Sequence, residues 1–215
     1  MAVLFPHRRE RATRAALALA RPTPNTSAGM RETARENHPA GDIRPCRDDE
    51  RGAILAIVNE AAQVYRGVIP RDRWHEPYMP AEELARDVAA GVTFWGFETS
   101  GALIGIMGVQ PVGDVHLIRH AYVSPTAQGA GVGSALLRHL RDATPGQMLV
   151  GTWEAAAWAI RFYQRHGFAL VPRERIAPLL RAYWSIPDRQ VETSVVLADP
   201  PLTEARDGPH APLGG

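Results

Sequence analysis

Cysteine is almost missing from this 215-residue sequence, which contains only Cys46. A single cysteine cannot build an internal disulfide framework, so the composition favours a reducing compartment. No apolar run approaches the ~20 residues that span a bilayer. The stretch AALALA near the N-terminus is also shorter than the ~7–15-residue core of a signal peptide. We therefore expect a cytoplasmic protein with no membrane partner.

Net charge is also small, at +1. Nucleic-acid binding normally requires a basic patch or stripe, so no nucleic-acid partner is expected. Apolar residues make up 45% of the chain and charged residues 22%, which is ordinary globular composition. The length suits one domain with a real core.

The two ends of the chain differ in composition from the rest. Residues 1–40 are rich in Arg, Ala, Pro and small polar residues, and Met30 offers a second possible start. Residues 201–215 have the composition of a tail. We predict a disordered extension over 1–40, one folded domain over 41–200 and a disordered tail over 201–215.

Strand and helix patterns alternate through the predicted domain. Apolar and β-branched runs predict strands at 42–47, 92–98, 102–110, 115–123, 148–153, 168–171 and 191–198. Helical periodicity predicts helices after Asp48 as N-cap, over 81–91, after the glycines near 131, and over 155–166, with another candidate at 174–184. A hairpin signal at 99–101 begins an antiparallel meander, and the later strand–helix crossovers imply parallel pairing. The prediction is an α/β fold with a mixed, mostly antiparallel sheet of six or seven strands and about four helices.

The stretch SPTAQGAGVGSALLRHL places Gly129, Gly131 and Gly133 just before a helix. The third glycine comes one position too early for a dinucleotide fingerprint, and no Lys-Ser/Thr pair follows as in a Walker loop. Backbone N–H groups entering a helix can still hold a pyrophosphate without lysine or metal. The alternative is that the glycines only permit a tight turn and close packing.

Two motifs resemble the GNAT superfamily of acyl-CoA-dependent N-acetyltransferases. In AYVSPTAQGAGVGSALLRHL, the residues Gln128, Gly131 and Gly133 fit the family pattern Q/R-x-x-G-x-G/A. The segment AIRFYQRHGF resembles the second family signature. The resemblance covers roughly 42–198 and implies a GNAT-like sheet with acetyl-CoA as co-substrate. One departure is Ala156, where the family often has an Asn that helps to hold the pantetheine arm.

The resemblance also implies roles for individual residues. The backbone of Tyr122 and Val123 would hold the pantetheine arm, and the Val123 N–H would polarise the thioester carbonyl. Tyr163 would be the acid that protonates the leaving thiolate, unless it is simply a buried aromatic with a core partner. The complete set implied for the co-substrate is Tyr122, Val123, Gln128, Gly129, Ala130, Gly131, Val132, Gly133, Ser134, Ala159 and Tyr163.

The general base is open at this stage. If no bulge interrupts the strand at 115–123, His116 and His120 share a face, about 13 Å apart. That separation prevents them from chelating one metal through the strand, so no metal is expected. Either could act as base or relay, or be a hydrogen-bonded structural histidine. Glu76 is the third candidate.

The loop RDRWHEPYMP lies where this family builds its acceptor pocket. An aromatic wall with a carboxylate would suit a cationic amine, and loop packing is the alternative. The candidate acceptor residues are Trp74, His75, Glu76, Tyr78 and Trp153.

These features favour an N-acetyltransferase that moves the acetyl group of acetyl-CoA to a primary amine of a small molecule in a ternary complex. No cysteine lies in either motif, which argues against an acetyl-cysteine intermediate. Protein lysine or N-terminal acetylation and a non-catalytic acyl-CoA-binding module remain alternatives. The chain is expected to be a monomer or homodimer.

Overall fold

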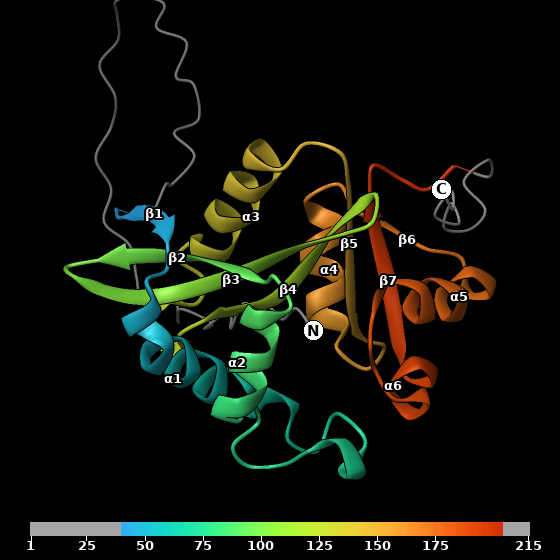
Figure 1. Cartoon of the computed structure of the whole chain (residues 1–215), viewed down its shortest axis with the longest axis horizontal. Helices are drawn as coiled ribbons and strands as arrows, with labels where there is room; N and C mark the ends of the chain where they lie inside the picture. The colour runs from blue at the N-terminus through green and yellow to red at the C-terminus, as the bar shows by residue number, and fades with distance from the viewer. Residues whose placement is uncertain (1–39, 204–215) are drawn as a thin grey trace, which may run out of the picture.

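The computed structural model describes residues 40–203 (Figure 1). Its strands are β1 (Asp42–Pro45), β2 (Thr93–Thr99), β3 (Ala102–Val112), β4 (Val115–Val123), β5 (Gln147–Trp153), β6 (Ala169–Leu170) and β7 (Ser194–Asp199). Its α-helices are α1 (Arg51–Ala61), α2 (Ala81–Ala89), α3 (Val132–Ala143), α4 (Ala157–Arg165), α5 (Arg173–Tyr183) and α6 (Asp188–Glu192). Short 3₁₀ turns lie at Asp48–Glu50, Ala62–Tyr65, Arg71–Arg73 and Pro125–Ala127.

The seven strands form one sheet in the order β1-β2-β3-β4-β5-β7-β6. Only the β4–β5 pair is parallel, and the other five pairs are antiparallel. The prediction of a mixed, mostly antiparallel sheet is therefore confirmed. The β2–β3 hairpin also forms as predicted, with Ser100 and Gly101 both at positive φ in its two-residue turn.

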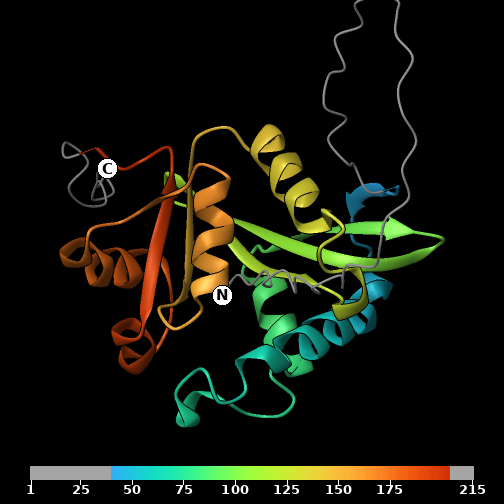
Figure 2. The ribbon, with the colours of Figure 1, turned by 180° about the vertical axis from the view of Figure 1, so that it is seen from behind.

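The helices divide between the two faces of the sheet. Helix α4 lies behind β5 in Figure 1 and in front of it in Figure 2, on the same side as α3. Helices α1 and α2 lie together at the other end of the molecule, below β2 to β4 in Figure 1. Two core clusters correspond to this division. The larger joins α3, α4 and α5 to the sheet, and the smaller lies between α1, the loop that follows it, and β4.

Three details differ from the sequence prediction. There are six α-helices among residues 40–203 rather than about four, and α6 takes the first residues of the stretch predicted as the last strand. Strand β7 is inserted between β5 and β6, because α5 and α6 return the chain to the middle of that half of the sheet. The predicted N-cap Asp48 lies instead in a 3₁₀ turn, and α1 begins at Arg51.

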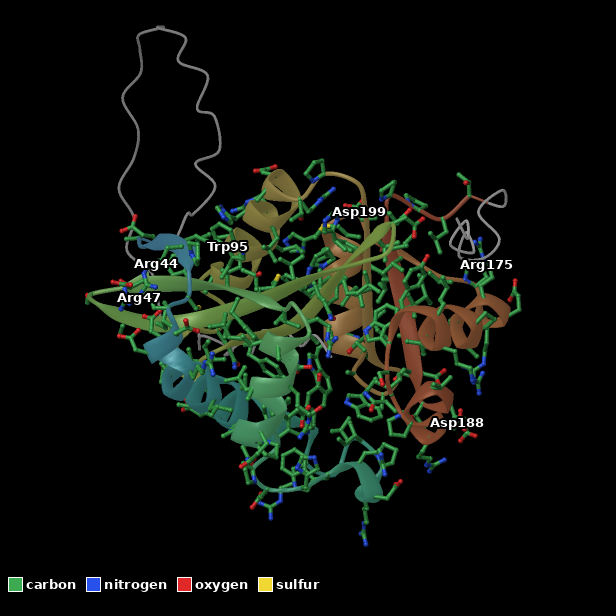
Figure 3. All side chains as sticks on the ribbon, in the orientation of Figure 1. Arg44, Arg47, Trp95, Arg175, Asp188 and Asp199 are labelled. Atoms are coloured by element: carbon green, nitrogen blue, oxygen red, sulfur yellow. The ribbon has the colours of Figure 1, made fainter. Side chains whose placement is uncertain are left out.

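The start of α1 is held by ion pairs, one of which joins Asp48 to Arg51 at 3.0 Å. The Arg44 guanidinium on β1 binds the carboxylates of Glu50 and Glu98 (Figure 3). Glu50 also accepts a 2.7 Å hydrogen bond from the Arg47 backbone N–H. These contacts tie β1 and β2 to the turn that leads into α1.

The disordered ends predicted at 1–40 and 201–215 fall almost entirely outside the described residues and remain predictions. Over residues 40–203, no helix combines the length and apolarity needed to cross a membrane. In the same part of the chain, no three His, Cys, Asp or Glu side chains are grouped so that they could hold a metal ion.

Candidate active site

The glycine loop enters α3 with the backbone that its sequence predicts. Gly129 and Gly131 have φ of 82° and 86°, in the left-handed region where side chains are costly. Gly131 is the N-cap of α3, and its carbonyl accepts the first helical bond from Ala135. The N–H groups of the first turn, Val132 to Ser134, therefore have no partner within the helix.

These N–H groups open onto a pocket of about 540 Å³, part of it open to solvent. On its other side lie Phe162 and Arg165 from α4. Its full lining is Val123, Ala127, Gln128, Gly129, Gly131, Val132, Gly133, Ser134, Phe162 and Arg165. The Gln128 side-chain amide donates to the Val123 carbonyl at 3.2 Å, which ties the loop to the end of β4. Ala130 is exposed and lies outside this lining.

Beside this pocket the sheet splits between β4 and β5. The two strands pair only from Val115 to Ile118 on β4, opposite Gln147 to Val150 on β5. Beyond that point β5 continues alongside β7, while Arg119 to Val123 pair only with β3. Tyr122 and Val123 therefore lie on a strand edge that has no strand partner besides β3, and an extended ligand can pair with such an edge.

Tyr163 on α4 is fully buried, and its hydroxyl has no hydrogen-bond partner in the structure. Its ring packs edge-on against Phe162 and Phe168, with centroids 5.1 and 5.4 Å away. Burial raises the pKa of Tyr163 above its ordinary value, so the hydroxyl keeps its proton. Ala159, one turn earlier on the same helix, is also fully buried. The alternative to an acid was a buried tyrosine whose hydroxyl bonds to a partner in the core, and the Tyr163 hydroxyl has no such partner.

Strand β4 contains a bulge that changes which residues share a face. Ile106 pairs with Tyr122 and Gly108 with Arg119, so three steps along β4 oppose two along β3. His120 lies in this bulge with φ of 50°. Before it, His116 shares a face with Ile118, which packs in the larger core. After it, His120 shares a face with Tyr122 in the smaller core. The expected common face for His116 and His120 does not exist, because the bulge reverses the alternation.

His120 is engaged with α2 rather than open to a substrate. It is 4% exposed, its Nε2 lies 2.6 Å from the Asp87 carboxylate, and its ring stacks on Phe94. Burial lowers the pKa of His120 below its ordinary value, despite the opposing effect of Asp87. Arg119 donates to the same carboxylate at 3.1 Å and to Gln110 at 2.7 Å. His116 is half-buried, and its Nδ1 has no partner.

The predicted acceptor loop contributes aromatic rings, but not the predicted carboxylate. The ring of Tyr78 packs against that of Trp74 and stacks on that of Tyr65, with ring centroids 5.5 and 5.7 Å apart, respectively. The Trp153 indole donates to the Tyr78 hydroxyl at 3.4 Å. His75 and Glu76 are exposed at the outer side of this cluster. Glu76 lies 3.5 Å from Arg66 in a surface ion pair.

Comparison with known proteins shows a likeness to one family. A family model described as an acetyltransferase (GNAT) domain matches residues 90–170, which is less than half of the chain. Over this segment the chain is similar to GNAT acetyltransferases. No curated protein matches it by sequence.

Solved GNAT structures share the fold. A GNAT acetyltransferase from Staphylococcus aureus Mu50 is 15% identical, with a TM-score of 0.55, and the match covers 74% of this chain and 98% of that one. PaiA N-acetyltransferase from Thermoplasma acidophilum, solved with coenzyme A, is 14% identical, with a TM-score of 0.55 and coverage of 73% and 96%. The ribosomal-protein-S18-alanine N-acetyltransferase from Escherichia coli is 18% identical, with a TM-score of 0.52 and coverage of 74% and 92%.

Acetyl-CoA is the co-substrate that the match to an acetyltransferase (GNAT) domain implies. Three features fit it: unpaired N–H groups at the start of α3, a free strand edge at Tyr122 and Val123, and an unpartnered Tyr163 hydroxyl. Ala156 stands where the family often has an Asn, and its side chain offers a ligand no hydrogen bond. Its methyl group is buried, and its backbone N–H donates to the Trp153 carbonyl.

Sequence reasoning missed three residues at or near this candidate site. Arg165 lies three positions after Phe162 and lines the same pocket, a spacing that places both on one helix face. Glu83 and Asp87 are four positions apart on α2, and Asp87 contacts Arg119 and His120 of β4. The i, i+4 spacing was readable, but which α2 face meets β4 was not.

Proposed function

We propose that this chain is an N-acetyltransferase that moves the acetyl group of acetyl-CoA to a primary amine of a small molecule, by direct transfer in a ternary complex. The observation that carries the proposal is the Tyr163 hydroxyl, which is buried and unpartnered on the helix that supplies Phe162 to the glycine-loop pocket. A buried hydroxyl without a partner costs free energy in the unliganded protein. A reacting thioester sulfur would supply the missing partner.

The co-substrate would be held mainly by backbone. The first-turn N–H groups of Val132, Gly133 and Ser134 would bind the pyrophosphate, with the positive end of α3 behind them. Arg165 adds a guanidinium at the other side of the same pocket. The free edge of β4 would pair with the pantetheine arm, and the Val123 N–H would donate to the thioester carbonyl as charge develops there.

Tyr163 would then act as the general acid. A thiolate leaving group has a pKa near 8.5, well below that of a buried tyrosine, so the phenol is protonated and available to donate when the C–S bond breaks. His120 suits this chemistry poorly as a base, because its Nε2 is occupied by Asp87. Glu76 is exposed and paired with Arg66, which also leaves it a poor candidate.

The acceptor side supports a small molecule more than a polypeptide. A packed aromatic cluster lies in the smaller core together with Tyr122 of β4, and it consists of Tyr65, Tyr78, Trp74 and Trp153. Such a wall suits a compact organic cation. A peptide would need backbone partners along an extended channel.

A thiol-release assay with a panel of amines tests the proposal, using acetyl-CoA and propionyl-CoA as donors. We expect amine-dependent release of coenzyme A together with the N-acetyl product, identified by mass. The chain contains no lysine, so modification of its own side-chain amines cannot account for the signal. If coenzyme A binds but no small amine or peptide amine is acetylated, the chain is a non-catalytic binding module and not an acetyltransferase. If only peptide amines are acetylated, the proposal of a small-molecule acceptor is wrong and the acceptor is a polypeptide.

A further inference from the structure

Glu83 is a carboxylate without a partner at the edge of the aromatic cluster. It lies in the first turn of α2 and is half-buried. Asp87, one helical turn later, binds both Arg119 and His120. Within residues 40–203, by contrast, Glu83 makes no hydrogen bond or ion pair. A half-buried charge without a counter-ion is unfavourable, and such groups concentrate at functional sites.

Two tyrosine hydroxyls lie near this carboxylate. Burial, with a smaller contribution from the Glu83 charge, raises the pKa of Tyr78 to about 12. The same two causes help to raise the pKa of Tyr122 well above its ordinary value. Tyr122 is 1% exposed, and its hydroxyl interacts with that of Tyr78. The Glu83 charge therefore acts on the side chain of the residue whose backbone forms the edge of β4.

The charges around Glu83 leave this corner negative. Arg119 is engaged with Asp87 and Gln110. Among residues 40–203, the cationic groups that act on Glu83 are His75 and Arg86, and both are exposed. Asp87 adds a second carboxylate to the same helix face. The aromatic and aliphatic side chains packed in the smaller core carry no charge of their own.

We propose that Glu83 binds the ammonium group of the acceptor and takes a proton from it, and that the acceptor is a primary amine with no carboxylate on the carbon that bears the nitrogen. The proposal rests on the N-acetyltransferase function proposed above. It assigns to Glu83 the carboxylate role that the sequence had suggested for Glu76.

The proton balance of the reaction is complete with this assignment. The Glu83 carboxylate takes one proton from the ammonium, and the neutral amine attacks the thioester carbonyl carbon. The C–N bond forms, the C–S bond breaks, and the thiolate leaves with the proton of the Tyr163 hydroxyl. The nitrogen loses its second proton, which restores Tyr163, and Glu83 returns its proton to solvent. Burial raises the pKa of Glu83, which brings this base closer to neutral pH than an exposed carboxylate.

The same charges argue against an α-amino acid as acceptor. Its carboxylate would lie two bonds from the reacting nitrogen, and therefore beside Glu83 and Asp87. Two or three carboxylates at this distance repel one another, and the buried cluster offers no cation to offset the repulsion. An amine of the same size without the carboxylate avoids this cost.

Matched pairs of acceptors test the substrate class. Phenethylamine against phenylalanine, and cadaverine against lysine assayed at its α-amine, differ only by a carboxylate. We expect kcat/KM to be at least tenfold higher for the decarboxylated member of whichever pair is turned over. Equal or higher kcat/KM for the amino acid would overturn the substrate class.

The variant Glu83→Gln tests the base, with Glu82→Gln as its control. Glu82 lies in the same turn of α2 and is exposed. We expect Glu83→Gln to lower kcat/KM at pH 7 by a hundredfold or more, with Glu82→Gln within twofold of the wild type. In Glu83→Gln, kcat/KM should rise about tenfold per pH unit from 7 to 9 with the fraction of free amine, whereas the wild-type profile should be flat there.

The possible failures are distinguishable. If no amine is acetylated although coenzyme A binds, the N-acetyltransferase function is wrong and the role of Glu83 is wrong with it. If amines are acetylated but Glu83→Gln keeps kcat/KM within threefold and the wild-type pH profile, only the role of Glu83 is wrong. The unfolding temperature of Glu83→Gln should equal or exceed that of the wild type, because an unpaired charge is removed, so lost activity would not reflect misfolding.

Discussion

The Nε2 atom of His120 lies 2.6 Å from the Asp87 carboxylate, and this contact joins the bulge of β4 to α2. Arg119, the other residue at the bulge, binds the same carboxylate at 3.1 Å. One acidic side chain therefore holds both residues where β4 separates from β5. The arrangement keeps His120 buried and uncharged at neutral pH.

His120 should make the protein less stable in mild acid. Burial lowers the pKa of His120 to about 4 in the folded protein, while the unfolded value is about 6.5. The unfolded state therefore binds more protons between these values, and stability is lost as the pH falls below about 6.5. The folded pKa of Asp87 is also lowered, which contributes only near and below its ordinary value of about 3.9.

The check is thermal unfolding of the wild type and His120→Gln at pH 7.5 and pH 5. We expect the drop in unfolding temperature between the two pH values to be smaller in the variant. His75→Gln, which replaces an exposed histidine, should behave like the wild type. A wild type that becomes more stable at pH 5 would mean that His120 is protonated in an ion pair with Asp87.

Removing the Tyr163 hydroxyl should slow catalysis without weakening the fold. General acid catalysis typically contributes about 10²–10⁴ in rate, so Tyr163→Phe should lower kcat by about a hundredfold or more. The affinity for coenzyme A should stay within about twofold. The hydroxyl has no partner in the folded protein, so the unfolding temperature should not fall. Unchanged turnover over the whole pH range would exclude Tyr163 as the acid.

Substituting Gly131 should weaken binding of coenzyme A through the backbone. An alanine at φ of 86° costs about 1–2 kcal/mol, and relief of that strain would rotate the first N–H groups of α3. Calorimetry should show at least a tenfold loss of affinity for Gly131→Ala. The matched control is Gly91→Ala, with φ of 93° and open space around it, at the end of α2. Similar affinities for the two variants would mean that the loop amides do not bind the ligand.

Arg165 should contribute an electrostatic part of the binding of coenzyme A. It lines the pocket across from the start of α3 and carries a charge opposite to phosphate. Arg165→Gln should weaken binding about three- to tenfold in low salt, and the difference from the wild type should shrink at high ionic strength. The control Arg161→Gln removes an exposed arginine from the same helix that lies outside the pocket lining. Equal effects of the two substitutions would point to net charge rather than a contact.

Much of the fold was readable from the sequence because its signals are local. Ser100-Gly101 between two apolar runs specifies a tight hairpin, and both residues adopt positive φ. Gly131 before an amphipathic run marks the start of α3, which begins at Val132. The motif spacing around Gln128, Gly131 and Gly133 pointed to the family whose model matches residues 90–170.

What the tertiary structure alone decided were relationships between distant segments. The position of β7 between β5 and β6 depends on how α5 and α6 turn the chain back, which no local pattern encodes. The bulge at His120 places that side chain on the opposite face from His116, and only the register against β3 reveals it. Glu76 and Glu83 are both carboxylates near the aromatic loop. Packing exposes the first and half-buries the second. The sequence determined which chemical groups are present and the family they serve, and long-range packing decided which of them meet.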